Sequence, residues 1–454
     1  MNPLASKAVR IKLFSFSSAP MRAFHLSWLA FFVCFFAWFS LAPLMPVVRG
    51  DLKLTKDQIA NINIAAVGIT VLVRLVIGPL CDKYGPRKVY TALLAVGSLP
   101  IFLVGLTHHY VSFLVLRLII GGIGASFVIT QYHTSVMFAP NVVGTANAAS
   151  AGWGNAGGGV TQSVMPWVLA AVVSTGVAQS VGWRVAMIVP GGMMLVVAVL
   201  YWKLTQDCPQ GNYAELRASG IAIEGGKKGG VTVFLRAARN YRVWMLFVTY
   251  GACFGIELFV HNVAATYYVD HYKLGLKAAG MAAGSFGLLA LFARALGGIL
   301  SDRVARVRGL DARALLLFGL MLGEGVGLLW FSGTPRVETA IVAMLTFGLF
   351  THMACGATYA LVPFIDRSAL GGVAGIIGAG GNVGAVLAGF LLKGVGNVGT
   401  CFAILGGSVL VASLCAVAVR FSSEHKAAED ALYRRAVAER ESTAPLGSPE
   451  ATPG

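Results

Sequence analysis

The sequence predicts an all-α membrane protein of about twelve transmembrane helices, arranged as two pseudo-symmetric halves of six helices each. Composition, the length of the apolar runs and an internal repeat lead to this prediction. Of the 454 residues, 57% are hydrophobic and 12% are charged, and the mean hydropathy is +0.75. A soluble domain carries about 25% charged residues. The chain therefore has too few charges to cover a surface that faces water.

The apolar runs have the length of membrane spans. Residues 24–48 contain one His and no Lys, Arg, Asp or Glu, and a transmembrane helix needs about 20 such residues. Some neighbouring spans are crowded, so a count lower by one or two stays open. We expect spans at 24–48, 60–80, 89–107, 112–134, 145–174, 183–203, 242–268, 276–300, 313–332, 339–363, 370–394 and 399–420.

The net charge of +16 comes mainly from loops on one side of the predicted membrane. The positive-inside rule makes that side cytoplasmic, with both termini inside and the bilayer as the partner of the apolar surface. The charge therefore does not indicate nucleic-acid binding. Residues 1–23 are basic and contain no acid, which would also suit an organelle transit peptide. A cytoplasmic tail is the preferred interpretation.

The chain divides into five segments. We predict a cytoplasmic N-terminal segment (1–23), a six-helix half (24–203), a polar and basic cytoplasmic linker (204–241), a second six-helix half (242–420), and a partly disordered cytoplasmic tail (421–454). The seven cysteines form no CxxC pair, and no His, Cys and carboxylate cluster has catalytic spacing. We therefore expect no metal, no cofactor and no enzymatic activity.

The two halves repeat each other in two places. The pattern R-x-x-x-G-x-x-x-D occurs at 74–82 and again at 294–302. Later in each half, AGWGNAGG at 151–158 matches GAGGNVGA at 378–385. Two matches in the same order indicate a duplication of a six-helix unit.

The repeated pattern places one arginine deep in each half. At a rise of 1.5 Å per residue, Arg74 lies about 12 Å along its helix from Asp82. Arg294 has the same position relative to Asp302. An arginine at this depth costs at least about 2.5–3.5 kcal/mol, and Glu257 and Glu324 are the only acids well inside the predicted spans. An anionic ligand is therefore preferred over a buried acid as the partner of the arginines.

Guanidinium is planar and can donate paired hydrogen bonds to a flat oxyanion. Phosphate or a carboxylate would satisfy the same rule, so charge alone does not select the ligand. The glycine-rich segments 151–166 and 371–389 supply Asn155 and Asn382 as amide donors. Most of the glycines can be explained by close packing of helices. The loop 78–88, with Asp82, Arg87 and the equivalent Asp302, is predicted to act in gating.

Several segments resemble known families. RLVIGPLCDKYGPRK resembles the loop motif of the major facilitator superfamily, and AGWGNAGGGVTQSVMP and GAGGNVGAVLAGF resemble the nitrate signature of its nitrate/nitrite porter family. Segments starting at Phe24, Tyr250 and Ala354 resemble the plant and algal high-affinity nitrate transporter branch. The resemblance covers about 24–420 and implies a major facilitator fold. It also implies that two arginines bind nitrate, here Arg74 and Arg294. The signature residues that line the same site would be Gly152, Gly154, Asn155, Gly380, Gly381 and Asn382.

The resemblance further implies coupling to protons and, for some members, a small accessory membrane protein. The tail here is shorter than in plant members, which leaves the accessory protein open. An intramembrane acid or His is the expected proton carrier, and Glu257 with His261 one turn on fits best. His261 stands where an acid is expected in plant relatives. A static salt bridge from Glu257 to Arg74 or Arg294 is the alternative, and Glu324 and His133 are further candidates.

These observations predict a secondary active transporter that imports nitrate, and nitrite as a second substrate, across the plasma membrane. Proton symport with alternating access is the predicted mode. Nitrate/nitrite exchange, transport of another small anion, and a nitrate receptor with little flux remain as alternatives.

Overall fold

A computed structural model describes residues 7–139, 142–221, 231–366, 369–427 and 431 of the chain. Within these residues the regular elements are helices, and twelve spans are long and apolar enough to cross a membrane. The predicted fold class and the count of twelve are confirmed. Parts of the predicted N-terminal segment and linker, and most of the predicted tail, lie outside the described residues.

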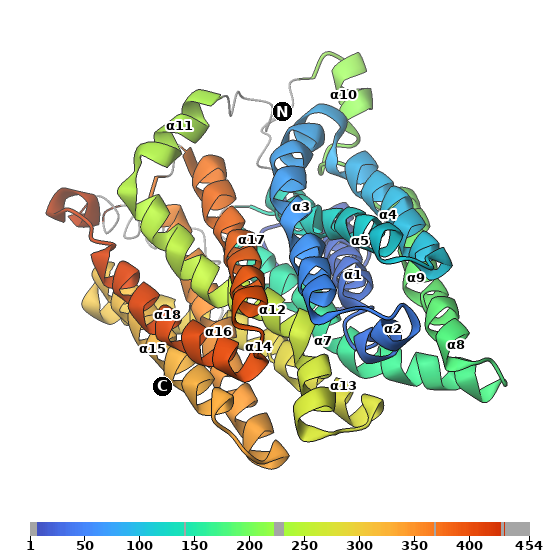
Figure 1. The fold of residues 1–454 in the computed structure, drawn as a ribbon. Coiled ribbons are helices and arrows are strands. Elements are labelled where there is room, and N and C mark those ends of the chain that lie inside the picture. The colour runs from blue at the N-terminus through green and yellow to red at the C-terminus, as the bar shows by residue number, and fades with distance from the viewer. Residues whose placement is uncertain (1–6, 140–141, 222–230, 367–368, 428–430, 432–454) are drawn as a thin grey trace.

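The first six spans precede the linker and the last six follow it (Figure 1). The first six are formed by α1 (Ala19–Phe39), α3 (Lys56–Tyr84), α4 (Pro86–Leu103) with η2 (Val104–Leu106), α5 (Tyr110–Gly121) with η3 (Gly122–Ala125) and α6 (Ser126–Met137), α7 (Val143–Ser174), and α8 (Gln179–Ala186) with α9 (Ile188–Leu204). The last six are formed by α12 (Tyr241–Tyr272), α13 (Leu276–Leu288) with α14 (Ala290–Arg308), α15 (Asp311–Ser332), α16 (Val337–Leu361) with η4 (Val362–Phe364), α17 (Leu370–Val395) and α18 (Val398–Ala418). The shorter helices are α2 (Met45–Asp51), α10 (Tyr213–Ala218) and α11 (Val231–Arg239).

Local sequence explains where the early helices begin and end. The predicted span 24–48 is divided, because α1 ends at Phe39 and α2 starts at Met45. Pro43 lies in this break and Pro46 lies in the first turn of α2. Proline offers no backbone N–H and restricts the residue before it, so it ends one helix and is accepted at the start of the next. The helix α3 starts after Thr55, whose hydroxyl and backbone N–H form a capping box with Gln58.

The two halves meet along a few helices. In Figure 1 the first half lies on one side and the second half on the other. Across the interface, α7 packs against α13 and α14, and α3 packs against α17. Within the second half, α12 lies along α17. The helices that carry the predicted site residues are therefore those at the interface.

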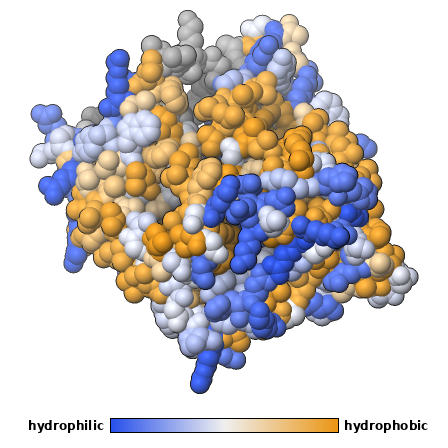
Figure 2. Space-filling view, in the orientation of Figure 1, coloured by the Kyte–Doolittle hydropathy of each residue, from blue (hydrophilic) through white to orange (hydrophobic). Residues whose placement is uncertain are grey.

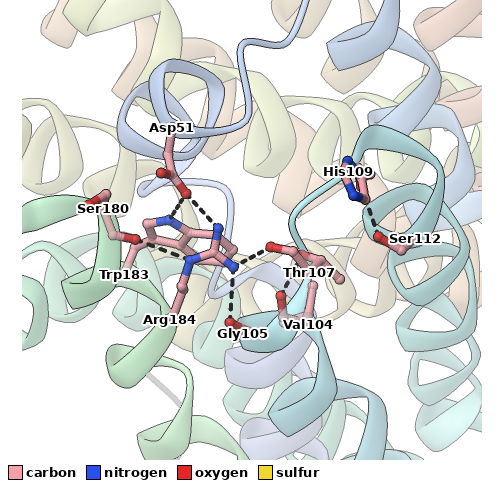
Figure 3. A network of polar contacts seen from close by, with 9 residues as sticks. All are labelled: Asp51, Val104, Gly105, Thr107, His109, Ser112, Ser180, Trp183 and Arg184. Carbon is pink, nitrogen blue, oxygen red and sulfur yellow. Dashed lines mark hydrogen bonds and ion pairs between the residues drawn. The ribbon is translucent and has the colours of Figure 1, made fainter.

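The two ends of the bundle differ. We call the end that carries α10, α11 and the turn between α3 and α4 the linker end, and the end that carries α2 the opposite end (Figure 1). At the opposite end, Arg184 donates to Asp51 Oδ2 at 2.7 Å and to the carbonyls of Gly105 and Thr107 (Figure 3). Trp183 Nε1 donates to the same carboxylate oxygen at 3.0 Å. This network ties α2, α8 and the end of η2 together.

Large apolar side chains cover much of the outer surface. Figure 2 shows broad hydrophobic areas, with hydrophilic side chains gathered toward the upper edge and around α2. Leu72, Val96, Val411 and Leu414 are each at least 60% exposed. Such a surface would be unstable in water and is suited to lipid. With its twelve spans, the protein is an integral, multi-pass membrane protein.

Among the described residues, polar contacts between the halves occur in the middle of the bundle and at the opposite end. At the opposite end Arg49 forms an ion pair with Asp270, and Lys393 Nζ donates to Asn61 Oδ1 at 2.9 Å. Further contacts join the halves deeper in the bundle and are described with the site. The halves are thus held together on the side away from the linker.

Candidate functional site

Arg74 of α3 reaches across to the second half without meeting an acid. Its Nη1 donates to the carbonyl of Gly378 on α17 at 3.0 Å, and its Nη2 donates to the carbonyl of Gly124 at 3.4 Å. The guanidinium also lies 5.5 Å from the centre of the Phe127 ring. These described partners are neutral, so dipoles and an aromatic face take the place of an acid beside the positive charge of the partly buried Arg74.

Arg294 of α14 has a buried acid as its partner. Its Nη2 donates to Glu257 Oε2 of α12 at 2.5 Å, and Glu257 is 0% exposed. The guanidinium lies 5.3 Å from the Phe254 ring centre. From the sequence, an anionic ligand was preferred over a buried acid as the partner of Arg294, and a salt bridge to Glu257 was the alternative. The structure contains this salt bridge.

Glu257 is the centre of a small buried cluster. His352 Nδ1 lies 3.3 Å from Glu257 Oε2, and Cys355 Sγ lies 3.9 Å from the same oxygen. Glu257 Oε1 has no hydrogen-bond partner among the described residues. Within that part of the chain, no group of His, Cys, Asp and Glu side chains has the arrangement of a metal site. The cluster is thus a set of titratable groups around one carboxylate.

His261 lies close to this cluster in an apolar setting. Its ring centre is 5.0 Å from that of Phe39 and 5.8 Å from that of Phe286. Neither ring nitrogen has a hydrogen-bond partner among the described residues. Its backbone carbonyl accepts a hydrogen bond from Gln162 Nε2 of α7 at 2.6 Å. The prediction that His261 takes part in proton coupling stays a prediction.

A chain of four aromatic rings connects the surroundings of the two arginines. The ring centres of Phe127 and Tyr359 are 5.9 Å apart, those of Tyr359 and Tyr250 are 5.0 Å apart, and those of Tyr250 and Phe254 are 5.1 Å apart. Phe127 and Phe254, at the two ends, each lie under one guanidinium. Both arginines therefore border one aromatic lining built from both halves.

The two arginines also lie at equal depth along their spans. The span of Arg74 starts at Lys56, and the span of Arg294 starts at Leu276. The number of residues from the start of the span to the arginine is the same in both. At 1.5 Å per residue, each lies about 27 Å from the opposite end of its span. The duplication that the sequence predicts thus places equivalent charges at one level.

Asn155 of α7 and Asn382 of α17 are buried amides without partners. They are 1% and 0% exposed, and no described residue hydrogen-bonds to the side-chain nitrogen or oxygen of either. A buried amide without a hydrogen bond costs free energy. Each side chain therefore leaves a donor and an acceptor for another molecule.

The four signature glycines lie where helices approach closely. A Cβ on Gly152 would lie 2.9 Å from a carbonyl oxygen of α14, and one on Gly380 would meet a carbonyl oxygen of α12. A Cβ on Gly154 or Gly381 would collide with a phenylalanine ring of a neighbouring helix. Close packing explains all four positions, and a role for them in lining the substrate site stays a prediction.

The predicted gating residues of the first half contact residues of the linker, and Asp302 contacts a residue of its own half. The Arg87 backbone N–H donates to Asp207 Oδ1 at 2.9 Å, and the Asp82 carbonyl accepts from Arg217 Nη2 at 2.7 Å. In the second half, Asp302 Oδ1 accepts from Arg313 Nη1 at 2.6 Å. Asp207 also accepts the backbone N–H of Tyr213, and burial raises its pKa. Gating by these residues stays a prediction.

The sequence did not single out several residues of the interface. Arg117 of α5, Tyr250, Tyr359 and His352 all carry polar atoms in or near the buried region, and they fall outside the repeated motifs. Arg117 interrupts the apolar run 112–134, and this charge was a signal that sequence reasoning could have used.

The two further proton candidates lie apart from the arginines. Glu324 of α15 is 0% exposed, and neither carboxyl oxygen has a hydrogen-bond partner among the described residues. His133 belongs to a network inside the first half, where Nδ1 is 2.5 Å from Tyr201 Oη and Nε2 is 2.8 Å from the Gln206 carbonyl. Neither residue is in contact with Arg74 or Arg294 through a described hydrogen bond.

Comparison with known proteins places the chain in a family. The model of the Major Facilitator Superfamily matches residues 27–365. The chain is 40% identical to the high affinity nitrate transporter 2.5 of Arabidopsis thaliana over 84% of this chain and 76% of that protein. It is 38% identical to the nitrate transporter 2.2 of Chlamydomonas reinhardtii, covering 84% and 74% of the two chains.

More distant proteins agree in fold. The chain is 27% identical to the nitrate/nitrite transporter NrtP of Nostoc punctiforme, over 89% of this chain and 93% of that protein. A bacterial homolog of the human lysosomal transporter Spinster superposes with a TM-score of 0.64 at 14% identity, covering 88% and 95% of the chains. The nucleoside transporter NupG gives a TM-score of 0.63 at 14% identity, covering 88% and 99%. With its fold, its duplicated motifs and these relatives, the chain belongs to the Major Facilitator Superfamily and, within it, to the nitrate/nitrite porter family that holds the high-affinity nitrate transporters of plants and algae.

Proposed function

We propose that this protein is a secondary active transporter that imports nitrate, and nitrite as a second substrate, by proton symport with alternating access. The charge balance of the buried site carries the proposal. Arg74 and Arg294 contribute two positive charges and Glu257 contributes one negative charge. While Glu257 is ionised, the net single positive charge of these three residues matches one monovalent anion. The relatives from Arabidopsis thaliana and Chlamydomonas reinhardtii are nitrate transporters.

Arg74 offers one of the two cationic contacts of the central site. Its guanidinium is held by two carbonyl oxygens, which an oxyanion can replace with a charge-assisted and stronger hydrogen-bond partner. Nitrate is planar and can accept paired hydrogen bonds from the guanidinium fork. The unpartnered amides of Asn155 and Asn382 supply further donors.

Glu257 couples the anion to a proton in this proposal. While the carboxylate is ionised, it competes with the anion for Arg294. A proton on Glu257 removes this competition, so proton and anion bind together. His352, 3.3 Å from the carboxylate, is placed to pass the proton.

Coupling is needed because the membrane potential opposes the anion. Moving a monovalent anion into a cell with a negative interior is uphill by about 2.3 kcal/mol per 100 mV. Two protons per nitrate would make the net movement of charge inward and positive. The basic loops support a cytoplasmic linker end. Parting of the halves at the opposite end would then expose the site to the outside of the cell. The loops with Asp82, Arg87 and Asp302 would control the return step.

Purified protein in liposomes tests the proposal. Uptake of isotopically labelled nitrate is measured with an imposed inward proton gradient, and counterflow against internal nitrate or nitrite is measured without one. Gradient-driven accumulation is expected. Counterflow without gradient-driven accumulation would instead indicate an exchanger. Saturable nitrate binding without either flux would indicate a receptor.

A further inference from the structure

A third arginine lies inside the membrane-spanning region, and the mechanism above does not use it. Arg117 of α5 is 1% exposed. Thr70 Oγ1 of α3 donates a hydrogen bond of 2.6 Å to the Gly121 carbonyl of α5, so these two residues lie at the same level of the bundle. This level serves to compare the depths of Arg117 and Arg74. From this level Arg74 lies one turn toward the linker end and Arg117 one turn toward the opposite end. The two arginines are thus about 12 Å apart along the bundle.

The guanidinium of Arg117 is held by neutral oxygens from both halves. Nη1 donates to the Trp38 carbonyl of α1 at 2.5 Å, and Nη2 donates to Asn262 Oδ1 of α12 at 3.1 Å. Nε has no hydrogen-bond partner among the described residues. Neither partner carries a charge. Arg117 thus resembles Arg74 in its environment and differs from Arg294, which has a carboxylate.

The contact with Asn262 belongs to the surface on which the halves close. The neighbouring residue of α12, His261, accepts the hydrogen bond from Gln162 of α7 through its carbonyl. One turn of α12 therefore receives donors from α5 and α7 of the first half. If the halves part at the opposite end, this turn withdraws and Arg117 loses the oxygen of Asn262.

We propose that Arg117 is an outer binding station for the transported oxyanion, covered by Asn262 when the halves are closed at the opposite end and uncovered when they part. The proposal rests on the proposed anion transport. A small oxyanion replaces the Asn262 oxygen on Nη2 and reaches the free Nε, forming the paired contacts that a planar guanidinium favours. The backbones of the two arginines are offset by about 12 Å along the bundle, and the two guanidiniums donate to different sets of oxygens. They therefore form two separate stations. The anion would therefore be passed from Arg117 to Arg74.

The substitution Asn262→Asp tests the station. A carboxylate at this position would pair with Arg117 and compete with the anion, as Glu257 does with Arg294. We expect the KM for external nitrate in liposome uptake to rise at least about tenfold, the effect of losing one charge-assisted hydrogen bond. Nitrate binding to the purified protein, measured by thermal stabilisation, is expected to persist because the central site is intact. Arg117→Lys keeps the charge and loses the planar guanidinium, so it should also raise the KM for external nitrate.

Asn61→Asp is the matched control. Asn61 Oδ1 also accepts from a cation of the other half, Lys393, at the opposite end. This variant strengthens a contact between the halves without touching Arg117, and its KM should stay within about twofold of wild type. An equal rise of KM in Asn61→Asp, or wild-type KM in both Asn262→Asp and Arg117→Lys, would overturn the station. Failure of the wild type to bind or transport nitrate would instead overturn the proposed function.

Discussion

Replacing Glu257 by Gln isolates the competition on which coupling depends. The variant keeps the shape of the side chain and removes the charge that pairs with Arg294 at 2.5 Å. Removing one partner of a buried ion pair costs about 3–5 kcal/mol, because the other charge is left uncompensated. We therefore expect the purified variant to unfold at a lower temperature than wild type when no anion is added.

Nitrate should recover part of this loss. An anion that pairs with the freed Arg294 regains about 1.5–3 kcal/mol, the value of a hydrogen bond to a charged group. Since about 1.4 kcal/mol corresponds to a factor of ten, nitrate should bind roughly 10- to 100-fold more tightly to Glu257→Gln than to wild type at neutral pH. Acidification should tighten binding to wild type and leave the variant unchanged.

Thermal unfolding followed by tryptophan fluorescence, with nitrate titrated against chloride at several pH values, measures both effects. Glu324→Gln is the matched control, because Glu324 is equally buried in the same half and has no arginine partner among the described residues. Its nitrate affinity should match wild type. If Glu257→Gln folds and binds nitrate more weakly than wild type, while Glu324→Gln does not, Glu257 supports the anion site and does not compete with it.

Four further variants test the substrate site and the loop that carries Asp207. Arg74→Lys keeps the charge and loses the planar fork, so nitrate affinity in the same assay should fall about 10- to 100-fold with folding preserved. Asn155→Asp and Asn382→Asp place a negative charge beside the anion, and binding isotherms with labelled nitrate should show a loss of at least about tenfold. Asp207→Asn leaves one acceptor oxygen for two backbone N–H groups, and chemical denaturation should show a loss of about 1–3 kcal/mol. Because burial raises the pKa of Asp207, the folded protein keeps this proton at a pH where the unfolded chain has lost it. The stability advantage of wild type over Asp207→Asn should therefore shrink as the pH rises above about 4, the ordinary pKa of an aspartate in an unfolded chain.

Each of these expectations has a result that would contradict it. Near-normal nitrate affinity in Arg74→Lys would remove the fork of Arg74 from the site. Wild-type binding by Asn382→Asp would reduce the second signature to a packing motif. A stability difference for Asp207→Asn that grows with pH would contradict the raised pKa.

The fold could be predicted because its causes are local and periodic. Runs of about 20 apolar residues are sufficient to define spans, and the repeated arginines at 74 and 294 gave the duplication without knowledge of any contact. The end of α1 was predicted too late, since hydropathy continues through Pro43 and Pro46 while the backbone conformation does not.

The partners of the site residues could not be predicted in the same way. Whether Glu257 pairs with Arg74 or with Arg294 depends on how α12 and α14 pack against each other. No local sequence pattern gives the distance between the Glu257 carboxylate and either guanidinium. The aromatic chain through Tyr250 and Tyr359 joins residues more than 100 positions apart. Arg117 was visible as a charge in an apolar run, but its contact with Asn262 depends on how the halves meet.

The current evoked by nitrate as a function of external pH tests the central claim most directly. It is recorded in cells that lack other nitrate transport and express wild type, Glu257→Gln or Glu324→Gln at equal surface levels. An inward current that grows with acidity in wild type and in Glu324→Gln is expected. In Glu257→Gln the current should be lost while exchange of labelled nitrate persists. The same pH dependence in Glu257→Gln as in wild type would contradict proton coupling through the Glu257–Arg294 pair.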